Sequence, residues 1–144
     1  MKLSTRTKYG VMALLELALS YGKGPIQLKV IAERQDISIK YLEQLISILK
    51  AGGFVRSVRG SKGGYELAKP PGQVKLNDCF NCLEGPVITV ECIGDDKICA
   101  KISDCIIRQV WFQVNDAIEN VLSSITLMDL VNAIGKRESL NYQI

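Results

Sequence analysis

One stretch of the sequence, ISIKYLEQLISILKAGGFVRSVRGSKGGYEL at residues 37–67, limits the fold more than any other. Its apolar side chains recur at helical spacing, at Leu42, Leu45, Ile46 and Leu49. One face of this segment therefore packs against a core. Ser38 is placed to be the N-cap, because its hydroxyl can accept a hydrogen bond from a backbone amide in the first turn. Gly52 and Gly53 follow the last periodic residue, where a left-handed residue commonly ends a helix.

Two short strands with a basic, glycine-rich turn are predicted directly after this helix. Residues 54–59 and 65–68 have the composition of strands, and the turn is Gly60-Ser61-Lys62-Gly63-Gly64. A helix with polar side chains at its N-terminus, followed by a cationic hairpin, suits a DNA groove and the phosphates beside it. We therefore predict a winged helix-turn-helix.

The rest of the first half supplies the other helices of that fold. An apolar helix is predicted from Thr5 to Tyr21, ended by residues 22–25, and a shorter one carries Leu28, Ile31 and Ala32. Residues 35–37 then turn the chain into the helix that follows Ser38. The order helix, helix, turn, helix, hairpin predicts a mainly α fold with a small β-hairpin wing.

The second half is predicted to be helical around an irregular middle. Residues 69–72, KPPG, are the best candidate for a boundary, which divides a winged helix-turn-helix domain at 1–75 from residues 76–144. Asn77 or Asp78 can cap a short helix that runs to about Glu84. Residues 87–104 have no clear period. A long helix begins near Asp104, and a last short helix is predicted over residues 126–134.

The long helix carries a wide apolar stripe, formed by Ile107, Val110, Trp111, Val114, Ala117, Ile118, Val121 and Ile125. The chain after residue 76 is too short to enclose this stripe. Packing on its own winged domain is the simpler alternative, but we expect a second copy of the chain to cover it, since homodimers are the commonest assemblies. Residues 76–144 are therefore predicted to hold a cysteine segment and the dimerisation helices.

Charge is distributed unevenly along the chain. Residues 1–75 carry 13 Lys and Arg against 5 Asp and Glu, whereas residues 76–144 carry 5 against 10, so the halves have net charges of +8 and −5. A basic half that contains the predicted helix and hairpin is typical of a module that binds phosphates. Double-stranded DNA is the partner that this pattern favours.

Several classes of protein are disfavoured by composition. The apolar run near the N-terminus is broken by Glu16, and no stretch approaches the roughly 20 apolar residues that cross a bilayer. We therefore expect a cytoplasmic protein with no membrane partner and with reduced thiols. The sequence contains no histidine, which removes imidazole-dependent catalysis, and it offers no nucleophile–base pair, so an enzyme is not predicted.

Three of the five cysteines form a candidate metal site. Cys92, Cys99 and Cys105 are separated by six and five residues, in a segment that runs into the long helix. Three thiolates on an irregular segment can converge on one centre, and sulfur ligands select iron–sulfur clusters, zinc or copper(I). The other two, Cys79 and Cys82, share one helix face, and we favour core packing over metal binding for them.

The segments MKLSTRTKYGVMALLELA, YLEQLISILKAGGFVRSVRGSKGGYEL and LEGPV, with the cysteines after them, resemble the Rrf-two family of bacterial regulators. The resemblance covers nearly the whole chain and is weakest beyond about residue 125. It implies a homodimeric transcription regulator whose recognition helix enters the major groove while the wing lies along the minor groove.

The resemblance also implies which residues bind DNA: Ser38, Lys40, Tyr41, Glu43 and Gln44 on the helix, and Arg56, Arg59, Ser61 and Lys62 on the wing. Side-chain chemistry supports the assignment. Gln44 can bond an adenine edge in two places, and Arg59 suits a narrow, electronegative minor groove. Ser61 and Lys62 suit phosphates. Glu43 could accept a hydrogen bond from cytosine and so act as a selectivity filter, or it could be a simple surface residue.

In the cluster-binding members of the family, three cysteines in this segment hold an iron–sulfur cluster, which implies a two-iron or four-iron cluster on Cys92, Cys99 and Cys105. Zinc on the same thiolates is a less favoured alternative. The family's histidine and aspartate ligands correspond to Arg108 and Lys8 here. A fourth ligand would then come from the partner chain, a small exogenous ligand, or a nearby carboxylate: Glu91, Asp95, Asp96 or Asp104.

Two hypotheses follow. The first is a DNA-binding regulator that senses iron–sulfur, iron or redox status through the three cysteines. The alternative resembles a metal-free branch of the family, which regulates cysteine metabolism under the control of a partner protein. The DNA-binding half is similar in both branches, and the three cysteines favour the first.

Overall fold

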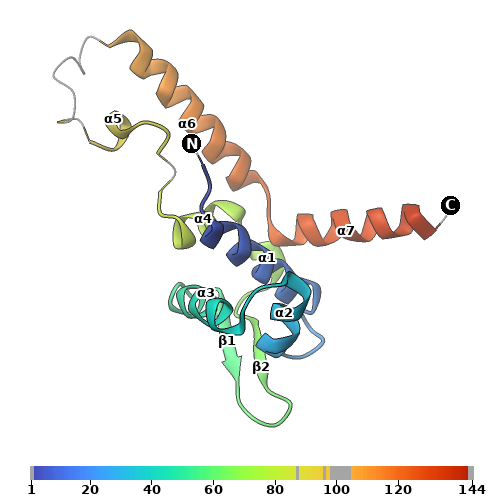
Figure 1. Cartoon of the computed structure of the whole chain (residues 1–144). Helices are drawn as coiled ribbons and strands as arrows, with labels where there is room; N and C mark the ends of the chain where they lie inside the picture. The colour runs from blue at the N-terminus through green and yellow to red at the C-terminus, as the bar shows by residue number, and fades with distance from the viewer. Residues whose placement is uncertain (1, 87, 96, 98–104, 143–144) are drawn as a thin grey trace.

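The computed structural model describes residues 2–86, 88–95, 97 and 105–142 (Figure 1). Its elements, in chain order, are α1 (Thr5–Leu19), α2 (Leu28–Gln35), α3 (Ile39–Ala51), β1 (Val55–Val58), β2 (Gly64–Leu67), the 3-10 helix η1 (Pro71–Gln73), α4 (Leu76–Leu83), α5 (Glu91–Gly94), α6 (Ile106–Ser124) and α7 (Leu127–Tyr142). The predicted fold class is confirmed: the described chain is mainly helical, with one antiparallel hairpin as a wing.

The first three helices enclose one apolar core. Fully or nearly fully buried side chains come from α1, α2 and α3, among them Leu14, Leu17, Ile31, Leu42, Ile46 and Leu49. α3 then ends where the sequence predicted, because Gly53 adopts a left-handed φ of 82°. Because one face of α3 is buried in this core, the opposite face is turned toward solvent.

The hairpin is anchored at its base. β1 and β2 pair antiparallel, with Val55 opposite Leu67 and Val58 opposite Gly64. The backbone of Ile26, from the loop before α2, adds a further bridge to Tyr65 through two hydrogen bonds of 2.8 Å. A Cβ at Gly64 would collide with the Ile26 backbone, so this close approach requires glycine.

The same core extends beyond residue 75. Val74, Leu76, Cys79, Leu83 and Leu127 are buried in it, so α4 and the first residue of α7 pack with the helices of the first half. A backbone bridge pairs Lys75 with Thr126. The Leu76 amide donates to the Ile125 carbonyl oxygen and the Leu127 amide to the Val74 carbonyl oxygen, both at 2.9 Å. The division at residue 75 stays a prediction; the apolar core crosses it.

Three local features differ from the sequence-based expectations. α4 begins after Lys75 and not after Asn77 or Asp78, because the bridge to Thr126 holds Lys75 extended and Asp78 falls in the first turn. α5 is a four-residue helix in a stretch with no period. α7 continues to Tyr142, well beyond residue 134, since the chain after Gly135 lacks proline and a single glycine is tolerated inside a helix.

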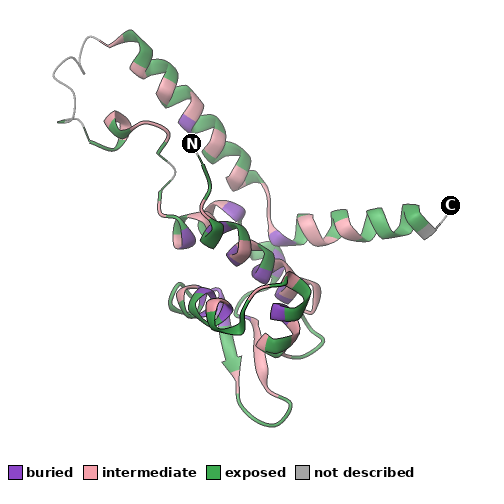
Figure 2. Cartoon of the chain, viewed as in Figure 1, coloured by how far each residue is buried: buried purple, intermediate pink, exposed green. Residues whose placement is uncertain are grey.

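α6 and α7 project from this body in different directions (Figure 1). α5 lies beside the N-terminal half of α6 (Figure 1). Both α6 and α7 are mostly exposed or half-buried along their length (Figure 2). Across the described residues, every helix is too short or too polar to span a lipid bilayer.

Candidate nucleic-acid interface and cysteine segment

The N-terminus of α3 is built as the sequence predicted. The Ser38 hydroxyl accepts a hydrogen bond from the Tyr41 backbone amide at 3.1 Å, which makes Ser38 the N-cap. Before it, Asp36 adopts a left-handed conformation (φ 52°, ψ 49°) that ends α2 and turns the chain sharply into α3. Ser38, Ile39 and Lys40 are exposed, so the start of α3 is open to solvent on one side.

α3 has two chemically different faces. Leu42, Leu45, Ile46 and Leu49 are buried. The other face exposes the predicted DNA-binding residues Lys40, Glu43 and Gln44. These three line an open depression of about 490 Å³ together with Ser47 and Ile48. The depression offers a cation, a carboxylate and an amide on one helix face, which are groups that can read base edges in a major groove.

Tyr41 is half-buried and packs against α1. The rings of Tyr9 and Tyr41 meet edge to face, with centroids 6.2 Å apart. Tyr9 lies within the apolar helix predicted from Thr5 to Tyr21, but periodicity within one helix does not identify the partner on another. Tyr9 thus supports a residue that the family resemblance assigns to DNA binding.

The two strands of the wing carry an ion pair. Arg56 and Glu66 are opposite each other in the register, and their side chains approach within 2.6 Å. Arg56 was predicted to bind DNA; its side chain remains 63% exposed while it is paired. Glu66 was not among the residues predicted to bind DNA, although the predicted hairpin places its strand beside that of Arg56.

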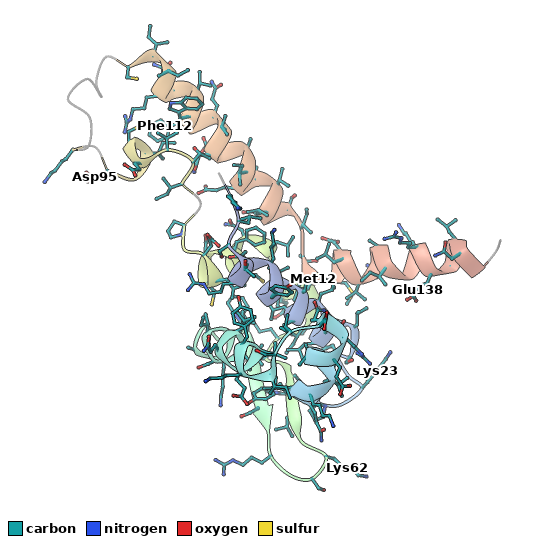
Figure 3. All side chains as sticks on the ribbon, viewed as in Figure 1. Met12, Lys23, Lys62, Asp95, Phe112 and Glu138 are labelled. Atoms are coloured by element: carbon teal, nitrogen blue, oxygen red, sulfur yellow. The ribbon has the colours of Figure 1, made fainter. Side chains whose placement is uncertain are left out.

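A hydrogen bond joins α3 to the wing. Lys50, in the last turn of α3, donates to the Ser57 hydroxyl at 3.2 Å. Arg59, Ser61 and Lys62 are exposed around the turn between the strands, and Lys62 lies at the tip of the hairpin, away from the body (Figure 3). The cationic tip and the polar face of α3 thus belong to one continuous unit, and Lys50 is a cation of that unit that sequence reasoning did not select.

The candidate metal site lies only partly within the described residues. Cys92 is on α5 and Cys105 is the residue before α6, and both are half-buried. Cys99, Asp96 and Asp104 lie outside the described residues. Within those described, no group of three or more Cys, Asp, Glu or His side chains is placed to hold a metal. Convergence of the three thiols therefore stays a prediction, and the described donors alone do not complete a cluster site.

The other candidates for a fourth ligand are also placed. Glu91 and Asp95 are exposed, and so is Lys8, which stands where the family resemblance implies an aspartate. Asp95 accepts a hydrogen bond from the Lys97 backbone amide at 2.9 Å. Arg108, at the position where the family resemblance implies a ligand, donates to the Cys92 carbonyl oxygen at 3.2 Å. Its guanidinium lies 4.7 Å from the centroid of the Phe112 ring.

Cys79 and Cys82 pack in or against the core, as the sequence analysis favoured. Cys79 is completely buried, and this burial raises the pKa of its thiol to about 12. Burial also raises the pKa of the Cys82 thiol, whose sulfur lies 3.7 Å from the Ile48 carbonyl oxygen. A thiol with a raised pKa is a poor nucleophile and a poor metal ligand at neutral pH.

α6 presents an uncovered apolar face. Asn115 is its one buried residue. Apolar side chains exposed along this face of α6 include Ile107, Val110 and Val121, with Ile106 beside them at the first turn. An open depression of about 410 Å³ is lined by Val114, Ala117, Ile118, Val121 and Leu122. Such a long uncovered stripe on a helix is typical of an interface with another chain.

Comparison with known proteins gives consistent matches over most of the chain. The model of the Rrf2 (Rrf-two) family, described as an iron-dependent transcriptional regulator, matches residues 3–133. The transcriptional regulator CymR of Bacillus subtilis is 40% identical over an alignment of 145 positions, which covers the full length of both chains. The transcriptional regulator IscR of Cronobacter sakazakii is 39% identical over 92% of this chain and 81% of its own length.

Solved structures give the same picture. The structure of B. subtilis CymR, described as the global cysteine regulator, covers 92% of this chain and 98% of that one, with a TM-score of 0.80 and 38% identity. The structure of T. potens IscR covers 93% of this chain and 88% of that one, with a TM-score of 0.77 and 42% identity. Both matched regions therefore include most of the winged helix-turn-helix and of the long helices after it.

Proposed function

Since this chain belongs to the Rrf2 family of DNA-binding transcription regulators, we propose that it acts on DNA as a homodimer and answers to a signal at its cysteine segment. The family and the relatives above are regulators rather than enzymes. The observation that carries the proposal is the exposed polar face of α3, continuous with a cationic wing through Lys50 and Ser57. As a bacterial DNA-binding protein, the chain would act in the cytoplasm.

In the proposed complex, α3 lies in the major groove and the hairpin reaches toward the adjacent minor groove. Gln44 would read an adenine, and Glu43 would select cytosine or exclude other bases. The exposed cations Lys40, Arg59 and Lys62 would contact phosphates or the minor groove, with Ser61 beside them. Two copies joined through α6 would place two recognition helices on two half-sites.

The first candidate for the signal is an iron–sulfur cluster on Cys92, Cys99 and Cys105. Support comes from the soft donor set and from the position of Cys105 directly before α6. A bound cluster would supply a centre that responds to iron and to oxidants. The chain's own contribution would be three thiolates and the connection from Cys105 into the helix proposed to form the dimer.

The second candidate is metal-free control by a partner protein. One observation favours it. Arg108 stands where the family resemblance implies a metal ligand, and its side chain instead contacts the Cys92 carbonyl oxygen and the Phe112 ring. The full-length similarity to CymR, whose structure is described as that of a global cysteine regulator, agrees with this alternative. The resemblance of the cysteines to cluster-binding members favours the first.

An anaerobic purification with metal and sulfide analysis separates the candidates. Iron and sulfide in the protein, lost when Cys92, Cys99 and Cys105 are changed to serine, would support the cluster. Zinc at one equivalent per chain would indicate a structural site. A metal-free protein that still binds DNA would favour the partner-controlled regulator. Cys82→Ser is the matched control, since that half-buried side chain already lies 3.7 Å from the Ile48 carbonyl oxygen, to which a hydroxyl can donate.

DNA binding is tested with duplexes selected from a random-sequence library by the wild-type protein. Gln44→Ala should weaken binding by about 1–3 kcal/mol and relax selectivity at the adenine it reads. Lys136→Ala, on the exposed part of α7, is the matched control and should leave affinity unchanged. Equal selectivity for wild type and Gln44→Ala would contradict the assignment of α3 as the reading helix.

A further inference from the structure

Residues 88–95, called here the docked segment, lie against α6 through two side-chain contacts to backbone atoms. The Asn115 side-chain oxygen accepts a hydrogen bond from the Thr89 amide at 3.1 Å. Arg108 donates to the Cys92 carbonyl oxygen at 3.2 Å. Arg108 and Asn115 are seven residues apart, which is two helical turns, so both lie on the same side of α6, about 10 Å apart.

Asn115 is unusual in its surroundings. It is 7% exposed, and it is the one buried residue on α6, a helix otherwise rich in exposed apolar side chains. Its amide nitrogen lies 3.5 Å from a Glu119 carboxylate oxygen, so both ends of the amide have partners. A buried amide is tolerated only when it is hydrogen-bonded, and it favours one register over neighbouring ones. Asn115 therefore specifies where along α6 the docked segment lies.

Arg108 makes the second contact in a fixed orientation. The Phe112 ring, one turn further along α6, lies 4.7 Å from the guanidinium carbon, and Phe112 is on α6 beside α5 (Figure 3). A planar guanidinium held over a ring loses little freedom when it also donates a hydrogen bond. The bond to the Cys92 carbonyl thus fixes the backbone of the residue whose thiol is a candidate ligand.

We propose that Asn115 and Arg108 are positioning residues that hold the docked segment on α6 without a metal, and that they set the exposure of the Cys92 thiol. The proposal rests on the proposed function only in treating this segment as the part that receives the signal. A change at Cys92 that moves its backbone away from α6 would break the Arg108 contact, whereas the hydrogen bond at Thr89 lies three residues earlier and could persist.

The full-length protein, stripped of metal with a chelator, provides the test. Two readouts report on the segment itself: hydrogen exchange of peptides covering residues 88–95, and the rate at which N-ethylmaleimide alkylates Cys92. The variants are Asn115→Ala and Arg108→Gln. Gln113→Ala, an exposed polar residue of the same helix, is the matched control. Arg108→Lys keeps the charge and one donor.

We expect the two variants to raise exchange in the docked segment and alkylation of Cys92 by about tenfold, the loss expected for one partly buried hydrogen bond. Peptides from α1 to α4 should exchange as in wild type, and Cys105 should be alkylated at an unchanged rate. Arg108→Lys should lie between wild type and Arg108→Gln, because it can still reach the carbonyl but cannot stack on Phe112.

Unchanged rates at Cys92 and across residues 88–95 would overturn the proposal. Faster exchange throughout the protein would overturn it as well, since Asn115 and Arg108 would then support the whole fold and not the segment. Neither readout involves DNA or a metal, so a failure here is distinguishable from a failure of the proposed function.

Discussion

Tyr9 of α1 meets Tyr41 of α3 edge to face, with ring centroids 6.2 Å apart and ring planes at 87°. Edge-to-face pairs of this kind contribute about 0.5–1.5 kcal/mol beyond the area that they bury. Tyr41 is in the first turn of the proposed recognition helix. The N-terminal helix therefore orients a residue that we propose to contact DNA.

Replacing Tyr9 should weaken DNA binding although Tyr9 itself lies on α1. We expect Tyr9→Leu to raise the dissociation constant about 2- to 10-fold, the range that corresponds to loss of the aromatic pair. Tyr9→Phe keeps the ring and should bind as wild type, and Tyr21→Leu, at an exposed position in the turn after α1, is the control. Fluorescence anisotropy on a selected duplex measures the effect. Equal affinity for all three variants would show that Tyr41 needs no support.

The cations of the wing should act through phosphates. Arg59→Ala and Lys62→Ala are each expected to weaken binding across all DNA sequences and to lower the slope of log affinity against log salt by about 1. Both residues are exposed on the turn between β1 and β2. Lys136→Ala should leave the slope unchanged. A variant with reduced affinity and an unchanged slope would indicate a role in the shape of the wing.

Glu66 should restrain binding to DNA. Its carboxylate pairs with Arg56 at 2.6 Å and places a negative charge on the wing. Glu66→Gln removes that charge and releases Arg56 for phosphates, so affinity at low salt should rise about severalfold, as expected for one uncompensated cation. The double variant Glu66→Gln with Arg56→Gln should lose that gain. Titrations at two salt concentrations give the comparison, and a decrease in affinity for Glu66→Gln would show that the ion pair shapes the wing.

Glu84 should make stability depend on pH in the acidic range. Its carboxylate accepts hydrogen bonds from the Ser4 and Thr7 hydroxyls and the Ser4 amide at the start of α1, which lowers the pKa of Glu84. A lowered folded-state pKa stabilises the protein above the pKa of the unfolded chain, and that contribution is lost as the pH falls through the folded-state pKa.

Urea unfolding of wild type and Glu84→Gln tests this sign. Glu84→Gln should unfold at lower urea than wild type at pH 7, and the two curves should converge as the pH is lowered below about 4.5, the ordinary value for the group. Glu33→Gln on α2 provides an exposed comparison. A gap that stays constant down to strongly acid pH would exclude ionisation of Glu84 as the cause.

A charge in the apolar face of α6 should prevent dimer formation. Val121 is 57% exposed and lines the apolar depression on that helix. We expect Val121→Glu to sediment as a monomer, since burial of an unpaired carboxylate in an interface is strongly unfavourable. Asn120→Glu adds the same charge at an exposed neighbour and should remain dimeric. A dimer that tolerates Val121→Glu would have its interface elsewhere.

Features specified by neighbouring residues were predictable from the sequence. The N-cap at Ser38, the buried face of α3 and the left-handed Gly53 all depend on spacing within a few residues. The winged-helix order was predictable for the same reason, because each of its elements has its own periodicity and turn residues.

Features that depend on a distant partner were not predictable. α4 begins after Lys75 because Thr126 pairs with that residue from far along the chain. Tyr9 reaches Tyr41 across a helix packing, and Asn115 reaches the backbone of Thr89 from another element. The local spacing of these residues does not identify the distant residue that each one contacts. The convergence of Cys92, Cys99 and Cys105 is a relation of the same kind and stays a prediction.

The bridge between Lys75 and Thr126 has a consequence for how such regulators diversify. The chain leaves the core after α4 and returns to it at Thr126, where backbone hydrogen bonds of 2.9 Å join the residues that flank the bridge. The entropic cost of closing a loop rises by only about 0.6 kcal/mol for each doubling of its length. Insertions, deletions and new ligands between α4 and this bridge should therefore change the stability of the core around α1–α4 only slightly. The same DNA-binding fold can therefore be combined with different segments that bind different signals.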